Sequence, residues 1–202
     1  MKAMVATGYG TSEVLQFTTV EKPVPGPKEL LVKVVASSAT TADGMMLTGK
    51  PYFARLFVGL TKPKHPIPGT GFAGIVEAKG SEVQQFHVGE EVFGETTLGF
   101  STNAEYVVVS EAGVVLPKPA SLPFSEAACY CDGHLTSYNF LKRVTRIEPG
   151  SHVLVNGAAG SLGSSAVQIA RHFGAHVTGV CSSKNAGLVK SLGAQEIIDY
   201  QK

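Results

Sequence analysis

A glycine-rich turn between a strand-like run and a helix-like run constrains the fold of this chain most strongly. The turn from Ala158 to Gly163 joins the apolar run Ser151–Asn156 to a helical pattern that ends near Phe173. Its last two glycines match the pattern G-x-G-x-x-G, and Ala158 stands where the first glycine of that pattern would be. Gly160 would let a pyrophosphate approach the backbone, and Gly163 would let the helix pack closely on the strand. The turn therefore predicts a dinucleotide site at the amino terminus of a helix, where N–H groups and the helix dipole favour an anion.

Strand-like and helix-like runs alternate around this turn. The strand-like runs are Ser151–Asn156, His176–Val180 and Glu196–Ile198, and the helix-like runs are about Ser161–Phe173 and Lys184–Leu192. This βαβαβ order predicts parallel strands with right-handed crossovers. The alternative, that the glycines only form a tight turn, is disfavoured because strand, helix and second strand are all present. We expect the cofactor to contact the turn at Ala158, Ala159, Gly160, Ser161, Leu162 and Gly163.

The end of the second predicted strand indicates which nicotinamide cofactor is bound. An Asp or Glu there would accept a hydrogen bond from the ribose 2′-hydroxyl and would repel a 2′-phosphate. The segment instead has Ser182, Ser183 and Lys184, which offer hydroxyl donors and a cation. These groups suit a phosphate and predict NADPH. The alternative, that Ser183 only caps a helix and Lys184 is only a solvated side chain, stays open, and the two roles are compatible.

The first part of the chain has a different sequence pattern. Short strand-like runs are broken by turn residues, and helical periodicity is weak. The runs are Lys2–Thr7, Val14–Val20, Leu30–Ala36, Gly74–Ala78, Glu91–Phe93 and Tyr106–Val109. They predict an irregular β-barrel over residues 1–122. Residues 123–202 would then hold a helix over Ser125–Arg143 followed by the βαβαβ unit.

Charge and composition favour a small-molecule partner. The 202 residues carry 17 basic and 16 acidic side chains, a net charge of +1 that indicates neither a nucleic acid nor a membrane as partner. No apolar run approaches the length of a membrane span, and the amino terminus lacks a signal-peptide core. Three cysteines in a chain of this size indicate reduced thiols and a cytoplasmic location.

Several short motifs occur in an order that resembles one enzyme superfamily. In the first part these are Met1-Lys2-Ala3, Gly10–Leu15, Pro68-Gly69 with Gly74, Val88-Gly89-Glu90 and Ala104-Glu105-Tyr106. In the second part they are Leu135-Thr136, the turn up to Gly163, Leu192-Gly193-Ala194 and Ile198-Asp199-Tyr200. Together they resemble the medium-chain dehydrogenase/reductase superfamily and, within it, the zinc-independent quinone oxidoreductase branch.

This resemblance implies a fold and a site. The fold would be a GroES-like irregular β-barrel followed by the first βαβαβ half of a Rossmann fold, with substrate and nicotinamide between the two domains. By resemblance, Ser182, Lys184 and Tyr200 would contact the 2′-phosphate, and Thr136 would lie near the nicotinamide. The chain would end before the cofactor domain is complete, so we expect the 202 residues alone to be inactive. A homodimer of a longer parent protein is left open.

The residues do not predict a metal site. Zinc-dependent members of the superfamily have Cys, His and Cys at positions that match Thr40, Thr70 and Asp132 here. Two hydroxyls and one carboxylate do not make a catalytic zinc site. Cys129, Cys131 and His134 form a C-x-C-x-x-H pattern, but helical spacing places Cys129 and His134 on different faces.

The chemistry expected without a metal is hydride transfer to a quinone, an enone or a similar carbonyl compound. Such a reaction needs the substrate to be positioned and a proton to be supplied by a hydroxyl or a water. Tyr52, Thr40, Thr41 and Asp43 are the candidates in the first domain, and Tyr52 has the alternative role of aromatic packing. Two functions stay open: an NADPH-dependent reductase, and a non-catalytic protein that binds NADP or a partner.

Overall fold

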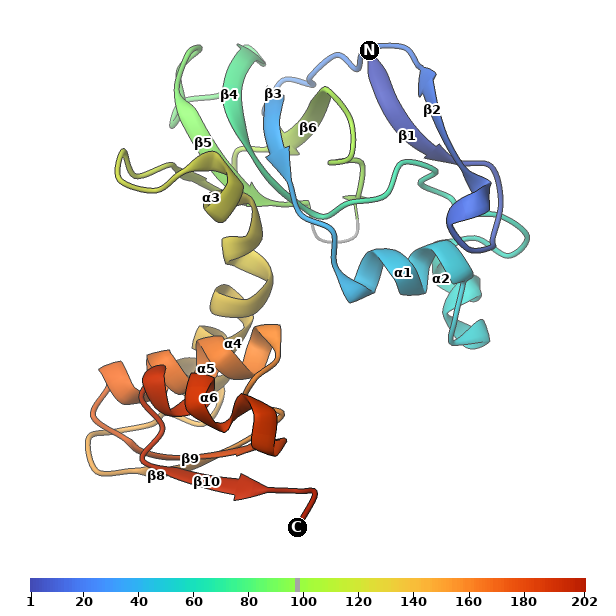
Figure 1. Cartoon of the computed structure of the whole chain (residues 1–202). Coiled ribbons are helices and arrows are strands. Elements are labelled where there is room, and N and C mark those ends of the chain that lie inside the picture. The colour runs from blue at the N-terminus through green and yellow to red at the C-terminus, as the bar shows by residue number, and fades with distance from the viewer. Residues whose placement is uncertain (97–98) are drawn as a thin grey trace. The chain divides into compact units, whose positions relative to one another are not determined.

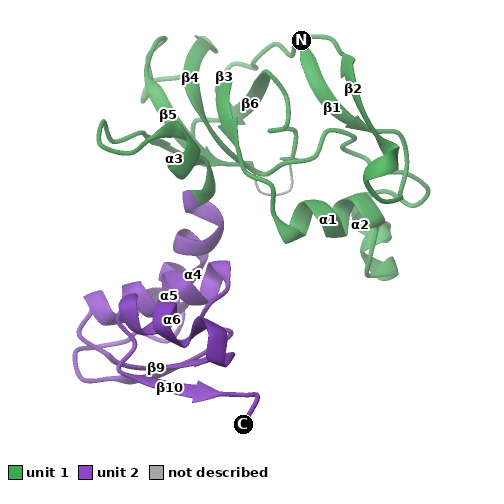
Figure 2. Ribbon diagram, in the orientation of Figure 1, with its two compact units in different colours: residues 1–129 green, residues 130–202 purple. Residues whose placement is uncertain are grey.

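The computed structural model describes residues 1–96 and 99–202 of the chain. These residues form two compact units, Met1–Cys129 (unit 1) and Tyr130–Lys202 (unit 2) (Figure 2). The predicted domain boundary after residue 122 lies just before helix α3 (Phe124–Tyr130), and the division into units falls at the end of that helix. Each unit has its own apolar core.

Unit 1 is built around a curled antiparallel sheet (Figure 1). Its strands are β1 (Lys2–Ala6), β2 (Leu15–Thr19), β3 (Glu29–Ser37), β4 (Gly71–Lys79), β5 (Glu91–Glu95), β6 (Tyr106–Ser110) and β7 (Val114–Pro117). Five of them form the sheet in the order β6-β3-β4-β5-β7, and β1 and β2 form a separate hairpin. Buried side chains such as Leu30, Val32 and Phe72 fill the concave core. The curled sheet agrees with the predicted irregular barrel.

Unit 1 also contains elements that the strand pattern did not predict. These are β7, the helices α1 (Thr41–Thr48) and α2 (Arg55–Val58), and the short 3₁₀ turns Ser12–Val14 and Tyr52–Ala54. Helix α1 begins with a capping box and ends at Gly49 in the left-handed conformation, φ 61°. Gly49 ends the helix because a residue with a side chain rarely adopts this conformation.

Unit 2 confirms the predicted βαβαβ order. Its strands are β8 (His152–Asn156), β9 (His176–Cys181) and β10 (Glu196–Asp199), and its main helices are α5 (Ser161–His172) and α6 (Ala186–Ser191), the latter preceded by a 3₁₀ turn, Ser183–Asn185. The strands are parallel, in the order β10-β9-β8. Figure 1 shows α5 and α6 on one face of this sheet. The buried side chains Val167, Val177 and Val189 join the helices to the sheet.

The predicted helix over Ser125–Arg143 is present, but its geometry is irregular. It consists of α3, a π-helical segment Cys131–Leu135, α4 (Thr136–Tyr138) and a second π-helical segment Asn139–Val144. Gly133 lies against the first turn of α5, where an added Cβ would be 2.8 Å from Ser165 Oγ and 2.9 Å from the Ser161 carbonyl oxygen. Wider π turns recur at functional sites. Among the described residues no helix is both long and apolar enough to cross a bilayer.

Candidate cofactor and substrate sites

The amino terminus of α5 has the geometry of a pyrophosphate site. The N-cap Gly160 is extended and no side chain caps the helix, so the first-turn N–H groups remain available to a ligand. Gly157 has φ 71°, which lets the chain turn sharply after β8. A Cβ at Gly163 would lie 2.2 Å from the Gly157 carbonyl oxygen, so only glycine allows α5 to pack this closely on the turn. These features fit the phosphates of a dinucleotide.

The other residues predicted in this turn are positioned around the same helix start. Ala158 is buried and its N–H donates to the Val180 carbonyl at 3.0 Å, which fixes the turn to β9. Ala159 is half-buried, whereas Leu162 and Ser161 are exposed. The hydroxyl of Ser161 donates to Asp132 Oδ2 at 3.3 Å. A carboxylate therefore lies beside the predicted phosphate site.

Thr136 lies on α4 next to the same turn. Its neighbour Ser137 is buried and donates through Oγ to the Leu162 carbonyl at 2.9 Å. This hydrogen bond holds α4 against the start of α5. Thr136 itself is half-buried. The arrangement is compatible with the predicted nicotinamide contact, which stays a prediction.

The residues predicted for the 2′-phosphate differ in accessibility. Ser183 and Lys184 are exposed in the turn after β9, and Tyr200 is 65% exposed after β10. Ser182 is only 3% exposed, and its Oγ accepts a hydrogen bond from Asn185 Nδ2 at 3.3 Å. The side chains of Ser183 and Lys184 are therefore more accessible to a ligand than that of Ser182.

The structure also places a carboxylate beside Ser183. Asp199, at the end of β10, accepts a hydrogen bond at Oδ2 from the hydroxyl of Ser183. The prediction of the 2′-phosphate site rested on the end of the second strand, and Asp199 entered only as part of the motif Ile198-Asp199-Tyr200. The signal was present, because parallel neighbouring strands end at one edge of a sheet and Asp199 pairs in register with Cys181.

In unit 1, Thr40 and Asp43 form the start of α1. The backbone N–H and the hydroxyl of Thr40 donate to Asp43 Oδ2 at 2.7 and 3.1 Å. The Gly69 N–H donates to Asp43 Oδ1 at 2.8 Å. Both carboxylate oxygens are therefore engaged in holding the backbone, which gives Asp43 a positioning role. Thr41 is the exposed first residue of the helix.

Tyr52 lies on the 3₁₀ turn before α2 and is 66% exposed. The guanidinium of Arg55 lies 5.0 Å from its ring centroid and 4.2 Å from that of Tyr9. Arg55 also donates to the carbonyl oxygens of Gly49 and Thr48, at 3.0 and 3.1 Å. The cation thus anchors the segment, and the Tyr52 side chain remains accessible.

Comparison with known proteins identifies the architecture. Residues 26–120 match the family model for the alcohol dehydrogenase GroES-like domain. The chain is 37% identical over 213 residues to 2-methylene-furan-3-one reductase of Solanum lycopersicum, which covers 100% of this chain and 53% of that protein. It is 35% identical over 216 residues to the mitochondrial NAD(P)H oxidoreductase RTN4IP1 of Mus musculus, covering 99% of this chain and 54% of that protein. The solved structure of the quinone oxidoreductase from Coxiella burnetii superimposes with a TM-score of 0.88 at 29% identity, covering 100% of this chain and 62% of that one.

The domain match, the relatives and the structural neighbour all place the similarity of this chain in the medium-chain dehydrogenase/reductase superfamily. The predicted fold class, a GroES-like domain followed by Rossmann strands, is confirmed, and so is the predicted resemblance to this superfamily. The chain spans only 53% to 62% of the three relatives described above. We therefore treat the activity, the substrate and the partners of the whole protein as proposals.

The positions predicted to match zinc ligands are Thr40, Thr70 and Asp132, and the structure shows the surroundings of each. The hydroxyl of Thr40 donates to Asp43, and Thr70 is 6% exposed, with its backbone carbonyl oxygen accepting from the Thr96 N–H at 2.9 Å. Asp132 accepts from Ser161. Within residues 1–96 and 99–202, no three His, Cys, Asp or Glu side chains gather as metal ligands do. Zinc independence stays a prediction.

The C-x-C-x-x-H pattern lies in the first π-helical segment and just before it. Cys129 is exposed and Cys131 is buried. The ring of His134 stacks on that of Tyr130, with centroids 4.1 Å apart and planes 9° apart. The aromatic stacking supports a packing role for His134.

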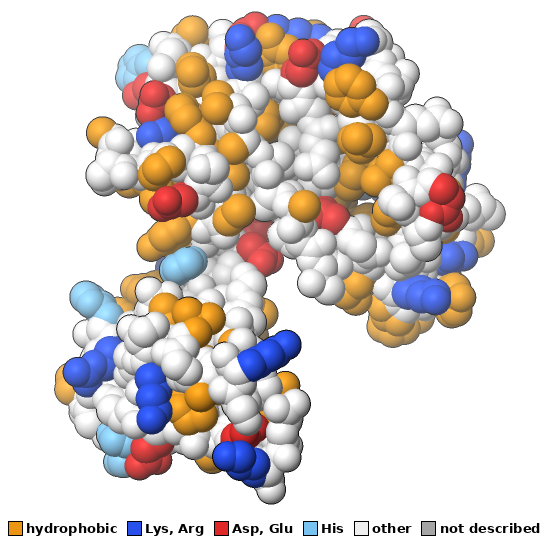
Figure 3. Space-filling model, in the orientation of Figure 1, with side chains coloured by type: hydrophobic (Ala, Val, Ile, Leu, Met, Phe, Trp, Pro, Cys, Tyr) orange, Lys and Arg blue, Asp and Glu red, His pale blue; other side chains and the backbone are white. Residues whose placement is uncertain are grey.

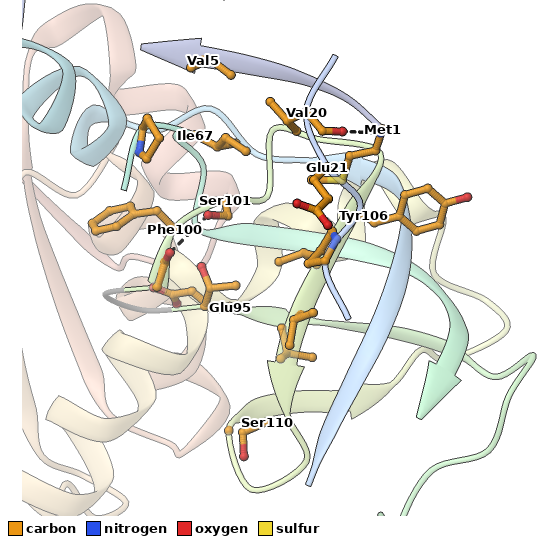
Figure 4. Close-up of a pocket in the computed structure, with 18 of the residues that line it drawn as sticks. Met1, Val5, Val20, Glu21, Ile67, Glu95, Phe100, Ser101, Tyr106 and Ser110 are labelled. Carbon is orange, nitrogen blue, oxygen red and sulfur yellow. Dashed lines mark hydrogen bonds between the residues drawn. The ribbon is translucent and has the colours of Figure 1, made fainter. Parts of the chain in front are cut away.

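A cavity of about 700 Å³ lies in unit 1 (Figure 4). It opens between the β1–β2 hairpin and β6, and its wall includes Val5, Ile67, Phe100 and Tyr106. None of the predicted substrate residues lines it. The cavity is therefore separate from the start of α1 as a candidate site.

Proposed function

We propose that unit 2 binds NADPH and that the whole protein is a zinc-independent reductase of quinones, enones or similar carbonyl compounds. The uncapped amino terminus of α5 carries the proposal, because no side chain bonds its first-turn N–H groups and Gly163 allows the helix to pack closely on the turn. The exposed Ser183 and Lys184 supply the donor and the cation for a 2′-phosphate.

The names of the relatives support an oxidoreductase that uses a nicotinamide cofactor. One is named as an NAD(P)H oxidoreductase, another as a reductase of 2-methylene-furan-3-one, and a third as a quinone oxidoreductase. Bound NADPH would supply a hydride from its nicotinamide. In this chain we assign the pyrophosphate to residues 158–163, the nicotinamide to Thr136, and the 2′-phosphate to Ser183, Lys184 and Tyr200 with Ser182 behind them.

The residues assigned to the substrate side have different roles. Tyr52, whose hydroxyl-bearing ring is exposed, is the candidate to orient a carbonyl oxygen or to deliver a proton. Thr40 is the second hydroxyl candidate, and Asp43 fixes Thr40 through two hydrogen bonds. A cytoplasmic location and a homodimer stay predictions; the mouse relative is named as mitochondrial.

The alternative is a non-catalytic NADP-binding protein. The three parallel strands of unit 2 correspond to the half of a Rossmann sheet that binds adenosine, whereas the nicotinamide half uses the further strands. We therefore propose that the 202 residues bind the adenosine half of NADPH and that turnover needs the further strands of a Rossmann sheet.

Two measurements test the proposal. Calorimetric titration of the chain with NADPH should show saturable binding at one site. The whole protein should then oxidise NADPH when a quinone or an enone is added. Binding without turnover in the whole protein would favour the non-catalytic alternative, and absence of binding would contradict both functions.

A further inference from the structure

A carboxylate lies inside the predicted 2′-phosphate site. Asp199 ends β10 and Ser183 begins the turn after β9, and the register that pairs Asp199 with Cys181 brings the two strand ends level. The Ser183 hydroxyl donates to Asp199 Oδ2, and the Gln201 N–H donates to Oδ1 at 3.0 Å. Asp199 is thus held facing the residues that would bind the phosphate.

The Asp199 side chain is charged at neutral pH. The hydrogen bond from Ser183, and then that from the Gln201 backbone, lower the pKa of the Asp199 carboxyl below its ordinary value. The nearby cation of Lys202 acts in the same direction. A ligand at this site therefore meets an anion as well as the cation of Lys184.

We infer that Asp199 is a cofactor-specificity residue that weakens the binding of NADPH relative to NADH. This inference rests on the proposed function of unit 2. The Ser183 hydroxyl has one donor hydrogen, and Asp199 takes it. A 2′-phosphate at Ser183 would have to displace this hydrogen bond and would then lie beside a negative charge.

The same geometry suits the cofactor without the phosphate. A ribose 2′-hydroxyl is neutral and can donate to a carboxylate lone pair that Ser183 leaves free. Asp199 would then act as the acid that nicotinamide-binding folds usually carry at the end of the second strand, although it comes from the next strand. Lys184 favours the phosphate and Asp199 opposes it, so the pair would set the ratio of the two affinities.

The experiment is a titration of the chain with NADPH and with NADH, comparing wild type with Asp199→Asn. Asparagine keeps an oxygen that can accept from Ser183 but removes the charge. The NADPH dissociation constant should fall about three- to fivefold, since the repulsion acts at an exposed site, and that of NADH should not fall. Glu196→Gln is the matched control, because Glu196 lies on the same strand at its opposite end. It should leave the ratio unchanged.

A second variant at the same position keeps the inference testable if Asp199→Asn does not fold. Asp199→Ala also removes the acceptor, frees the Ser183 hydroxyl and should shift the ratio in the same direction. The shift for both variants should shrink in high salt, because ions screen exposed charges. If wild type binds NADPH but the ratio is the same in both folded variants, the inference is wrong and the proposed function stands. If wild type binds neither nucleotide, the proposed function fails and the inference fails with it.

Discussion

At the scale of single residues, Lys184 is the cation on which the predicted phosphate contact depends. Lys184→Ala should weaken NADPH binding about tenfold or more, because one charge-assisted hydrogen bond is lost, and should change NADH binding far less. Titration calorimetry of both cofactors measures the difference. Lys190→Ala, which removes another exposed lysine at the end of α6, should change neither affinity. An equal loss for NADPH and NADH would contradict the assignment of Lys184.

Asp43 has a structural role that its predicted place in the substrate site did not suggest. Asp43→Ala removes the acceptor of Thr40 and Gly69, so it should lower the free energy of unfolding by about 1 to 3 kcal/mol. Urea unfolding followed by circular dichroism gives the value. Thr41→Ala changes the exposed neighbouring residue and should have little effect. An Asp43→Ala chain as stable as wild type would show that the capping box contributes nothing and would leave Asp43 only a chemical role.

At the scale of elements, the contact between α5 and its preceding turn depends on Gly163. Alanine is normally favoured over glycine inside a helix, but a Cβ at Gly163 would lie 2.2 Å from a backbone oxygen. Gly163→Ala should therefore lower the free energy of unfolding by about 1 to 3 kcal/mol. Gly187→Ala, in α6, meets no atom within 4 Å and should raise it by about 0.5 to 1 kcal/mol. Chemical denaturation measures the free energy of unfolding of both variants. A higher value for Gly163→Ala as well as for Gly187→Ala would disprove the close packing.

Elements with strong periodicity or strong turn chemistry could be predicted from the sequence. The βαβαβ unit followed from apolar runs separated by glycines, and the structure has all five of its elements. Helix α1 was missed, although Thr40 and Asp43 have the spacing of a capping box. The first π-helical segment could not be predicted from periodicity, because its Gly133 packs against Ser165, which is distant in sequence.

The candidate site was predicted from local residues, and its main omission is a contact between strands. The pyrophosphate turn is a continuous segment, so its residues could be identified from their order alone. The hydrogen bond between Ser183 and Asp199 depends on the register of two strands, which the sequence does not specify residue by residue. The sequence pattern also could not predict which side chains are exposed. Ser182, predicted to contact the 2′-phosphate, is buried.

At the scale of the whole molecule, we expect an enzyme that needs no zinc. The whole protein, purified without a histidine tag, should contain less than stoichiometric zinc, because Thr40, Thr70 and Asp132 replace the expected ligands. Dialysis against a chelator should leave NADPH oxidation unchanged. Elemental analysis and the assay test this together. Stoichiometric zinc that is lost along with activity would contradict it.

The central claim, that the three-stranded unit 2 holds the adenosine half of NADPH through its 2′-phosphate, has a direct test in the chain itself. The measurement is calorimetric titration of the 202 residues with 2′,5′-ADP and, separately, with 5′-AMP. We expect saturable binding of 2′,5′-ADP at one site, tighter than that of 5′-AMP and weakened by salt, because Ser183 and Lys184 would contact the additional phosphate. No binding of 2′,5′-ADP, or equal binding of the two nucleotides, would contradict the claim.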